Sequence, residues 1–191
     1  SFVSPKAIPQ LRDTAEVLSK LDLSNTATKL LAIVANRRGA EDACSFEEID
    51  YLGYPFSISE TFQKRNTNAT IDQSLARVEE MQSLSVKANK KMVVYISMAF
   101  GNPYGDPWSG ELAAVWTERL TKEVGIEIIA LSDTVGVSDQ SNIQELFETI
   151  IPAFPSVEIG AHLHSRPEDA VGKVHTAYLA GCRRFDAAIK G

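Results

Sequence analysis

Short apolar runs alternate along the chain with polar motifs and with longer amphipathic stretches. Apolar runs of strand length occur at residues 30–35, 49–54, 92–97, 126–131, 157–164 and 185–189. Stretches typical of helices lie at residues 40–46, 72–89, 109–124, 139–153 and 167–180. Strands that alternate with helices in this way indicate βαβ units and a parallel sheet.

Two architectures contain such a sheet, the doubly wound fold and the (β/α)8 barrel. Nucleotide-binding doubly wound folds carry a glycine-rich phosphate loop after a strand, but neither GxGxxG nor GxxxxGK follows any predicted strand here. A site built from many strand ends is instead the arrangement of a barrel. Polar residues do occur at the carboxyl end of nearly every predicted strand: Asn36, Ser57, Ser97, Asp133, His162 and His164.

Residues 1–4 can supply one more strand, which makes seven, one fewer than a closed barrel needs. Both ends also resemble the interior of a longer chain, because the sequence starts without Met and stops directly after an apolar run. We therefore expect residues 1–191 to form one α/β domain, a TIM-type (β/α)8 barrel that is incomplete.

The composition is that of a soluble globular domain. Lys and Arg number 19 and Asp and Glu 25, for a net charge of −6, with 44% hydrophobic and 23% charged residues. The densest basic clusters are the pairs at residues 90–91 and 183–184, which argues against a nucleic-acid surface. No apolar run approaches the roughly 20 residues of a membrane span. Cys44 and Cys182 are too few for a disulfide framework and indicate buried free thiols in a reducing compartment.

The sharpest chemical signal is the pair His162 and His164. Residues two apart on a strand point to the same face, about 6.6 to 6.8 Å apart along the chain. A turn at residues 165–167 follows at once, so both imidazoles can converge on one metal at the mouth of a barrel. The alternative is a pair of barrel-lining histidines that bond to their neighbours. The third histidine, His175, lies mid-helix and is expected at the surface.

Asp133 ends another predicted strand and precedes Thr-Val-Gly. Its carboxylate could hold a substrate hydroxyl or support an imidazole from behind. It could equally be the Asx-turn residue that starts the loop toward Gly136. The spacing alone does not decide between these roles.

Two further segments follow predicted strands. Asn36 with Arg37 and Arg38 could offer hydrogen bonds and charge to phosphates or carboxylates, although most such basic pairs are simply solvated. The loop at residues 101–108 is rich in glycine, proline and aromatic residues. It could line a pocket for a bulky acyl carrier, but its composition favours a rigid βα connection.

Several motifs together match one known family, in the order in which that family carries them. They are Ser1 to Lys6 with Pro9-Gln10, residues 59–62 and 66–68, Tyr95 to Ser97, residues 101–104, Asp133 to Gly136, and His162 to His164. On these motifs the chain resembles the hydroxymethylglutaryl-CoA lyases, metal-dependent barrel enzymes related to isopropylmalate and homocitrate synthases. The match spans the whole chain and is therefore more specific than any single motif.

The resemblance implies a reaction and a metal. The family binds a divalent cation, Mg²⁺ or Mn²⁺, and its HxH histidines are ligands, which assigns His162 and His164 to the metal. The implied reaction is retro-Claisen cleavage of hydroxymethylglutaryl-CoA to acetyl-CoA and acetoacetate. The resemblance places His162 near the proton that the 3-hydroxyl group loses. A hard cation chelated by hydroxyl and carboxylate oxygens lowers the pKa of that hydroxyl and orients the breaking bond.

The implied partner is an acyl-CoA thioester. The resemblance gives Asp133 a contact with the substrate and places Ser1 and Lys6 at the acyl site. Asn36 joins these substrate-binding candidates through its place after a strand. We expect no nucleic-acid or membrane partner, a homodimer as a possible assembly, and a cytoplasmic or mitochondrial-matrix location.

Other family features fall outside this sequence. The family's first strand carries an Arg–Asp pair, and a loop with a catalytic Cys and an Asn ligand follows its last strand; neither Cys44 nor Cys182 occupies that loop. We therefore expect strands two to eight of the barrel, and no turnover by residues 1–191 alone. Ser165 follows the HxH pair where the condensing synthases carry Asn-Asp, which favours a lyase. A condensing acyltransferase and an inactive scaffold fragment are the alternatives.

Overall fold

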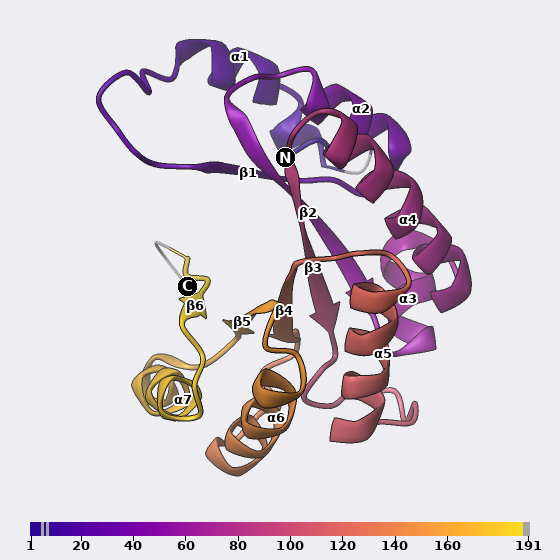
Figure 1. Cartoon of the computed structure of the whole chain (residues 1–191), viewed down its shortest axis with the longest axis vertical. Coiled ribbons are helices and arrows are strands. Elements are labelled where there is room, and N and C mark those ends of the chain that lie inside the picture. Colours follow the sequence, from indigo (N-terminus) through magenta and orange to yellow (C-terminus); the bar gives the residue numbers. More distant parts are fainter. Residues whose placement is uncertain (5, 7, 189–191) are drawn as a thin grey trace.

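The computed structural model describes residues 1–4, 6 and 8–188. Six parallel strands form one sheet in which spatial order equals chain order (Figure 1). The strands are β1 (Leu30–Ile33), β2 (Ile49–Ser57), β3 (Lys91–Ser97), β4 (Ile128–Asp133), β5 (Glu158–Leu163) and β6 (Arg184–Phe185). The sheet curls into a half-barrel, which confirms the expected incomplete TIM-type barrel.

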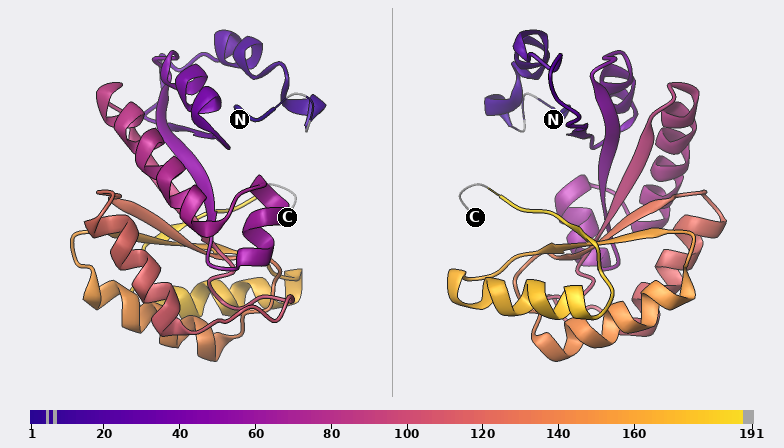
Figure 2. Two further views of the ribbon diagram at one scale, coloured as in Figure 1. Left: turned by 90° about the vertical axis from the view of Figure 1, so that its right-hand side faces the viewer. Right: turned by 60° about the vertical axis from the view of Figure 1, so that its left-hand side comes forward.

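Helices cover the outer face of the curved sheet (Figure 2). They are α2 (Arg37–Cys44), α4 (Ile71–Lys87), α5 (Gly110–Lys122), α6 (Gln140–Ala153) and α7 (Pro167–Leu179). Two shorter helices, α1 (Thr14–Lys20) and α3 (Glu60–Thr67), and a 3-10 turn at Pro9–Leu11 complete the described elements.

Side-chain caps determine where the long helices begin. Thr70 with Gln73 forms a capping box at α4, and Asp139 with Asn142 forms one at α6. Ser109 caps α5 by accepting a backbone N–H from the first turn. These caps explain why α4, α5 and α6 start within one residue of their predicted positions, while α7, which has no side-chain cap, begins at Pro167 as predicted.

The core lies between the sheet and the outer helices. All six residues of β4 are buried, as expected for a strand covered on both faces. Ile129 and Leu131 of β4 are fully buried, together with Met81 of α4 and Phe147 of α6. This apolar layer holds each helix against the sheet although the sheet does not close on itself.

The strand predicted at residues 1–4 is present only as a single parallel bridge between Phe2 and Val34. The backbone N–H of Phe2 donates to the carbonyl oxygen of Ile33 at 2.8 Å. The helix α2 passes very close to this bridge, since a Cβ at Gly39 would lie 2.2 Å from the carbonyl oxygen of Phe2. Gly39 therefore allows the helix and the bridge to lie side by side, where a larger residue would separate them.

Two other segments differ from expectation. The strand predicted at 185–189 is observed as the two residues Arg184–Phe185, and residue 189 lies outside the described residues. The helix α3 was not expected, because its sequence is polar and carries no apolar stripe. Ser59 caps this helix, which ends at Asn68 with a left-handed φ of 50°.

Cys44 and Cys182 are free thiols, as predicted, but only Cys182 is buried, whereas Cys44 is half-buried. Burial raises the pKa of both thiols above the usual value. They therefore stay protonated at neutral pH, as packing residues do. Within the described part of the chain, no helix has the length and apolar character that crossing a bilayer requires.

Candidate active site

A small cavity opens at the carboxyl ends of the strands. It encloses about 200 Å³. Its lining comes from the first five strands and the residues that follow them: Ile33, Pro55, Tyr95, Ser97, Ser132, Thr134, His162 and His164. Parallel strands all end on the same side of a sheet, so residues at their carboxyl ends gather there. The cavity thus brings together Ser97, His162 and His164, three of the polar residues predicted at strand ends.

The two imidazoles of the HxH pair converge. His162 lies on β5 and His164 one residue beyond it, and their Nε2 atoms are 3.3 Å apart. The ring of His162 is partly buried, whereas His164 is exposed. Both side chains therefore present the same ring nitrogen to one point, as their spacing predicts. Their role as metal ligands stays a prediction.

The spacing of the two Nε2 atoms fits a shared cation. With bonds of about 2.1 Å, two ligand atoms at right angles around a metal lie about 3 Å apart. No cluster of three or more His, Cys, Asp or Glu side chains that could hold an ion occurs among residues 1–4, 6 and 8–188. The described residues therefore bring two ring nitrogens to one point, without a third side chain of this kind beside them.

A carboxylate holds the first imidazole from behind. The Nδ1 atom of His162 lies 3.0 Å from Oδ2 of Asp186, which follows β6 directly. The edge of Tyr95 meets the same ring at a centroid distance of 5.4 Å. Burial, joined by the negative charge of Asp186, raises the pKa of Tyr95 to about 12, so its phenol keeps its proton at neutral pH.

Sequence reasoning did not single out Asp186. The available signal was its place at the carboxyl end of the last predicted strand, the same rule that selected Asp133 and His162. Support of an imidazole from behind was one of the roles that the sequence left open for Asp133. In the structure Asp186 makes this contact.

Asp133 instead organises the loop that follows β4. Its side chain is completely buried. Oδ1 accepts the backbone N–H of Val137 at 2.9 Å, while Oδ2 accepts the N–H of Ser138 at 3.1 Å and its hydroxyl at 2.5 Å. The carboxylate does not line the cavity of the histidines. This geometry favours the turn-forming alternative for Asp133 over contact with a substrate hydroxyl.

Lys173 connects this buried carboxylate to the HxH segment. The ammonium group, on α7, donates to Oδ2 of Asp133 at 3.2 Å and to the carbonyl oxygen of His164 at 3.3 Å. The lysine side chain is only 8% exposed. It therefore holds the backbone of His164 against the loop after β4. No local pattern predicts this contact, because mid-helix lysines are usually solvated.

A strained residue lies at the end of β3. Met98 is fully buried and has a φ of 62°, a left-handed conformation that methionine rarely adopts. Its N–H donates to Oγ1 of Thr134 at 3.1 Å. This bond ties the ends of β3 and β4 together and fixes Thr134 at the rim of the cavity, where strain of this kind is often found.

The remaining substrate-binding candidates lie apart from the histidines. Ser1 and Asn36 line a separate hollow of about 830 Å³ that also carries Arg12 and Arg38. The Asn36 side chain caps α2 by accepting the N–H of Gly39 at 3.0 Å, so its oxygen is engaged in the fold.

Ser1 and Lys6 differ in how they are held. The hydroxyl of Ser1 donates to the carbonyl oxygen of Ile33 at 3.2 Å, which fixes it beside β1. Lys6 is exposed and lines neither this hollow nor the cavity of the histidines.

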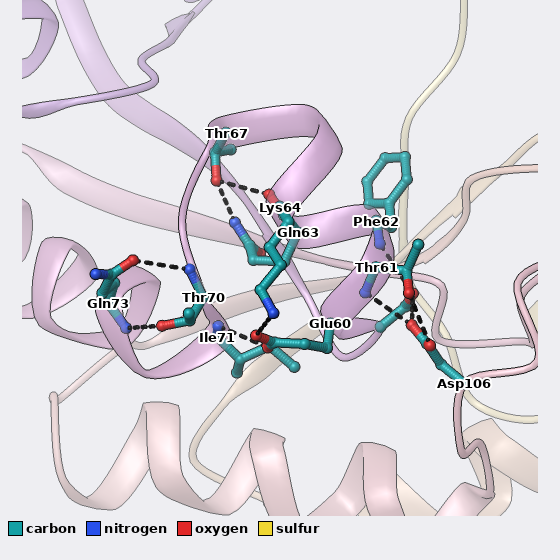
Figure 3. Close-up of polar contacts among 11 residues, drawn as sticks. Glu60, Thr61, Phe62, Gln63, Lys64, Thr67, Thr70, Ile71, Gln73 and Asp106 are labelled. Atoms are coloured by element: carbon teal, nitrogen blue, oxygen red, sulfur yellow. Dashed lines mark hydrogen bonds and ion pairs between the residues drawn. The ribbon is translucent and has the colours of Figure 1, made fainter.

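The loop at residues 101–108 does not line the cavity of the histidines; its Asp106 contacts the start of α3 instead (Figure 3). The carboxylate of Asp106 accepts the hydroxyl of Ser59 at 2.5 Å, and the N–H and hydroxyl of Thr61, both at 2.9 Å. These hydrogen bonds, that from Ser59 foremost, hold the pKa of Asp106 below its usual value. Within the loop, Oδ1 of Asn102 accepts the N–H groups of Tyr104 and Asp106.

Comparison with known proteins gives one consistent result. The HMGL-like family model matches residues 8–191. The hydroxymethylglutaryl-CoA lyase YngG of Bacillus subtilis is 32% identical over 191 residues, covering all of this chain and 63% of that protein. The hydroxymethylglutaryl-CoA lyase of Pseudomonas mevalonii is 31% identical, covering all of this chain and 62% of that protein.

Solved structures agree. The crystal structure of the B. subtilis HMG-CoA lyase has a TM-score of 0.89 at 31% identity, covering 97% of this chain and 61% of that one. An HMG-CoA lyase from Acinetobacter baumannii, in complex with coenzyme A and 3-methylmalate, gives 0.87 at 27% identity, covering 100% of this chain and 61% of that one. The chain spans just under two thirds of the length of the curated relatives it matches. It belongs to the HMGL-like family.

Proposed function

We propose that this chain is the main part of the barrel of a carbon–carbon lyase that cleaves hydroxymethylglutaryl-CoA to acetyl-CoA and acetoacetate. The observation that carries the proposal is the convergence of His162 and His164 at the carboxyl ends of the strands, with Nε2 atoms 3.3 Å apart. The names of relatives at 31–32% identity support the choice of substrate.

His162 and His164 would hold a divalent cation, Mg²⁺ or Mn²⁺, through their ring nitrogens. A bound cation of this kind lowers the pKa of a chelated hydroxyl and stabilises negative charge as a carbon–carbon bond breaks. Mg²⁺ prefers oxygen ligands and keeps several positions for water or substrate, so two nitrogen ligands leave room for the substrate oxygens.

The cavity selects the acyl end of the substrate. About 200 Å³ accommodates a branched acyl group but not a nucleotide carrier. The hydroxyl groups of Ser97, Ser132 and Thr134 line it and can hydrogen-bond to the acyl carboxylate and carbonyl oxygens. Tyr95, with its pKa raised to about 12, adds a neutral aromatic wall.

The hollow beside Ser1 and Asn36 suits the carrier. It encloses about 830 Å³ and carries the guanidinium groups of Arg12 and Arg38, which pair well with phosphate. Asp133 contributes to the site indirectly, because its hydrogen bonds to the N–H groups of Val137 and Ser138 hold the loop that carries Thr134.

The resemblance also places His162 near the proton that leaves the substrate hydroxyl. Its Nδ1 faces Asp186, so a proton can be accepted only at Nε2. An imidazole that holds a cation through Nε2 cannot accept a proton at the same atom. His162 therefore cannot hold the cation and accept the proton at the same moment.

The test is a cleavage assay on the protein expressed from its natural coding sequence. We expect hydroxymethylglutaryl-CoA and Mn²⁺ to give acetyl-CoA and acetoacetate in equal amounts, EDTA to abolish this, and His164→Ala to lower the rate at limiting Mn²⁺ by at least 10–100-fold. His175→Ala is the matched control, because His175 is an exposed histidine of α7. Turnover that survives both EDTA and His164→Ala would refute the proposal. Release of free CoA from acetyl-CoA and a 2-oxo acid would assign the protein to the condensing branch instead.

A further inference from the structure

We infer that Asp186 is a positioning residue for His162: it fixes the tautomer and the ring orientation, so that the unprotonated Nε2 faces the cavity. Only one consequence of this inference, the effect on the affinity for the cation, rests on the proposed function. The contact that carries it, 3.0 Å between Nδ1 of His162 and Oδ2 of Asp186, belongs to the protein alone.

The backbone sets the partner of His162 in place. The strand β6 pairs with β5 so that Phe185 lies opposite Ala161. The N–H of Asp186 then donates to the carbonyl oxygen of Ala161 at 3.0 Å. Asp186 and His162, the residues that follow this pair, are therefore in register as well. This register puts the carboxylate of Asp186 beside the ring of His162.

A close packing contact stabilises this register. A Cβ at Gly160 would lie 2.9 Å from Cδ of Arg184, so the arginine side chain lies flat across β5 only because glycine is there. The guanidinium of Arg184 donates to Oε1 of Glu158 at 2.9 Å. Arg184, two residues before Asp186, thus anchors β6 to β5 without using the imidazole.

The chemistry of the contact determines the tautomer. An ionised carboxylate can only accept hydrogen bonds, so Nδ1 of a neutral His162 must carry the proton. Its Nε2 then has a free lone pair, 3.3 Å from Nε2 of His164. Metal-binding histidines commonly use such a carboxylate behind the ring, which raises the basicity of the ligand nitrogen.

The two histidines consequently differ. The ring of His162 is held by Asp186 on one side and by the edge of Tyr95 on another. His164 is exposed and faces His162. His162 is the fixed member of the pair and His164 the adaptable one.

The test combines two readouts on the protein expressed from its natural coding sequence. Imidazole ¹⁵N shifts report which nitrogen carries the proton, and the chain holds only three histidines to assign. Titration with Mn²⁺, followed by its paramagnetic resonance signal, gives the Kd. We expect His162 to be protonated at Nδ1, and Asp186→Ala to release this tautomer and raise the Mn²⁺ Kd about 10–100-fold.

Asp186→Asn is the variant of equal shape. It keeps an oxygen that can accept from Nδ1, so we expect the tautomer to persist and the Kd to rise less than in Asp186→Ala. Asp72→Asn removes an exposed carboxylate from the first turn of α4 and should change neither readout.

An unchanged ¹⁵N spectrum of His162 in a folded Asp186→Ala protein would overturn the inference, as would a tautomer protonated at Nε2 in the unaltered protein. Failure of the proposed metal role looks different. In that case His164→Ala would leave the Mn²⁺ Kd unchanged, while the ¹⁵N shifts would still support or refute the role of Asp186.

Discussion

Asp133 and Lys173 place two charges inside the protein, beneath the loop that carries Thr134. Their side chains are 0% and 8% exposed. Each makes further hydrogen bonds, Asp133 to Ser138 and Lys173 to the carbonyl oxygen of His164. A buried pair of this kind adds little net stability over apolar residues, but loss of one partner leaves the other charge uncompensated.

We therefore expect Asp133→Asn to lower the free energy of unfolding by about 3–5 kcal/mol, measured by urea denaturation. The double variant Asp133→Asn with Lys173→Met should lose less, because it leaves no unpaired ammonium. A single variant that is as stable as the unaltered protein would show that water reaches Lys173 and that the pair is not buried in solution.

The residues of the site differ in how far the sequence reveals them. The spacing of His162 and His164 predicts their convergence, because alternation along a strand is a local rule. The partners of these residues, Asp186 and Lys173, lie 22 and 9 positions after His164. Their contacts depend on strand register and on the packing of α7, which no local pattern encodes. For the same reason the sequence could not choose between the two roles of Asp133.

At the scale of elements, caps and turns decide the structure. The capping boxes of α4 and α6 follow from short motifs, and these helices start where the sequence predicts. The helix α3 escaped prediction because a polar helix of eight residues has no apolar stripe to detect. It is stabilised through Ser59 and Thr61, which bind Asp106 from the loop before α5.

Asp106 makes this junction sensitive to acid. Its pKa in the folded protein lies below the ordinary value of 3.8, chiefly because of the hydrogen bond from Ser59. When the pKa of a carboxylate is lower in the folded state than in the unfolded state, its full contribution to stability is present above the pKa of the unfolded state. That contribution is lost as the pH falls through the pKa of the folded state. The free energy of unfolding of the unaltered protein should therefore exceed that of Asp106→Asn by the largest amount near neutral pH. This difference should shrink as the pH falls below 3.8.

Urea unfolding at a series of pH values measures this difference. Thr61→Val, which removes one neutral donor to Asp106 and keeps the carboxylate, is the control that should retain most of the pH dependence. A difference between the unaltered protein and Asp106→Asn that does not vary with pH would contradict the assignment.

At the scale of the whole molecule, the sheet is open. Residues 2 and 34 share a single bridge beside β1, and β6 contributes two residues at the other end. Unpaired backbone groups at such edges favour association with other strands. Among the described residues, no group of three His, Cys, Asp or Glu side chains that could hold an ion accompanies the two histidines, and a hard cation favours carboxylate oxygens.

Residues 1–191 produced alone should accordingly bind Mg²⁺ weakly and self-associate. Calorimetric titration and light scattering after gel filtration measure these two properties. A monodisperse monomer with tight Mg²⁺ binding would show that the open edges are protected and that the two histidines suffice.

The order of the strands has a consequence for how the protein is made. Each strand from β2 to β6 pairs with the one synthesised just before it, so every βα unit can dock as soon as it leaves the ribosome. Among the described strands, none must wait for a distant partner, and loop closure is short at each step. The contact between His162 and Asp186 joins the last two of these strands. The candidate site is therefore assembled at the end of this sequence of events, on a scaffold that has already formed.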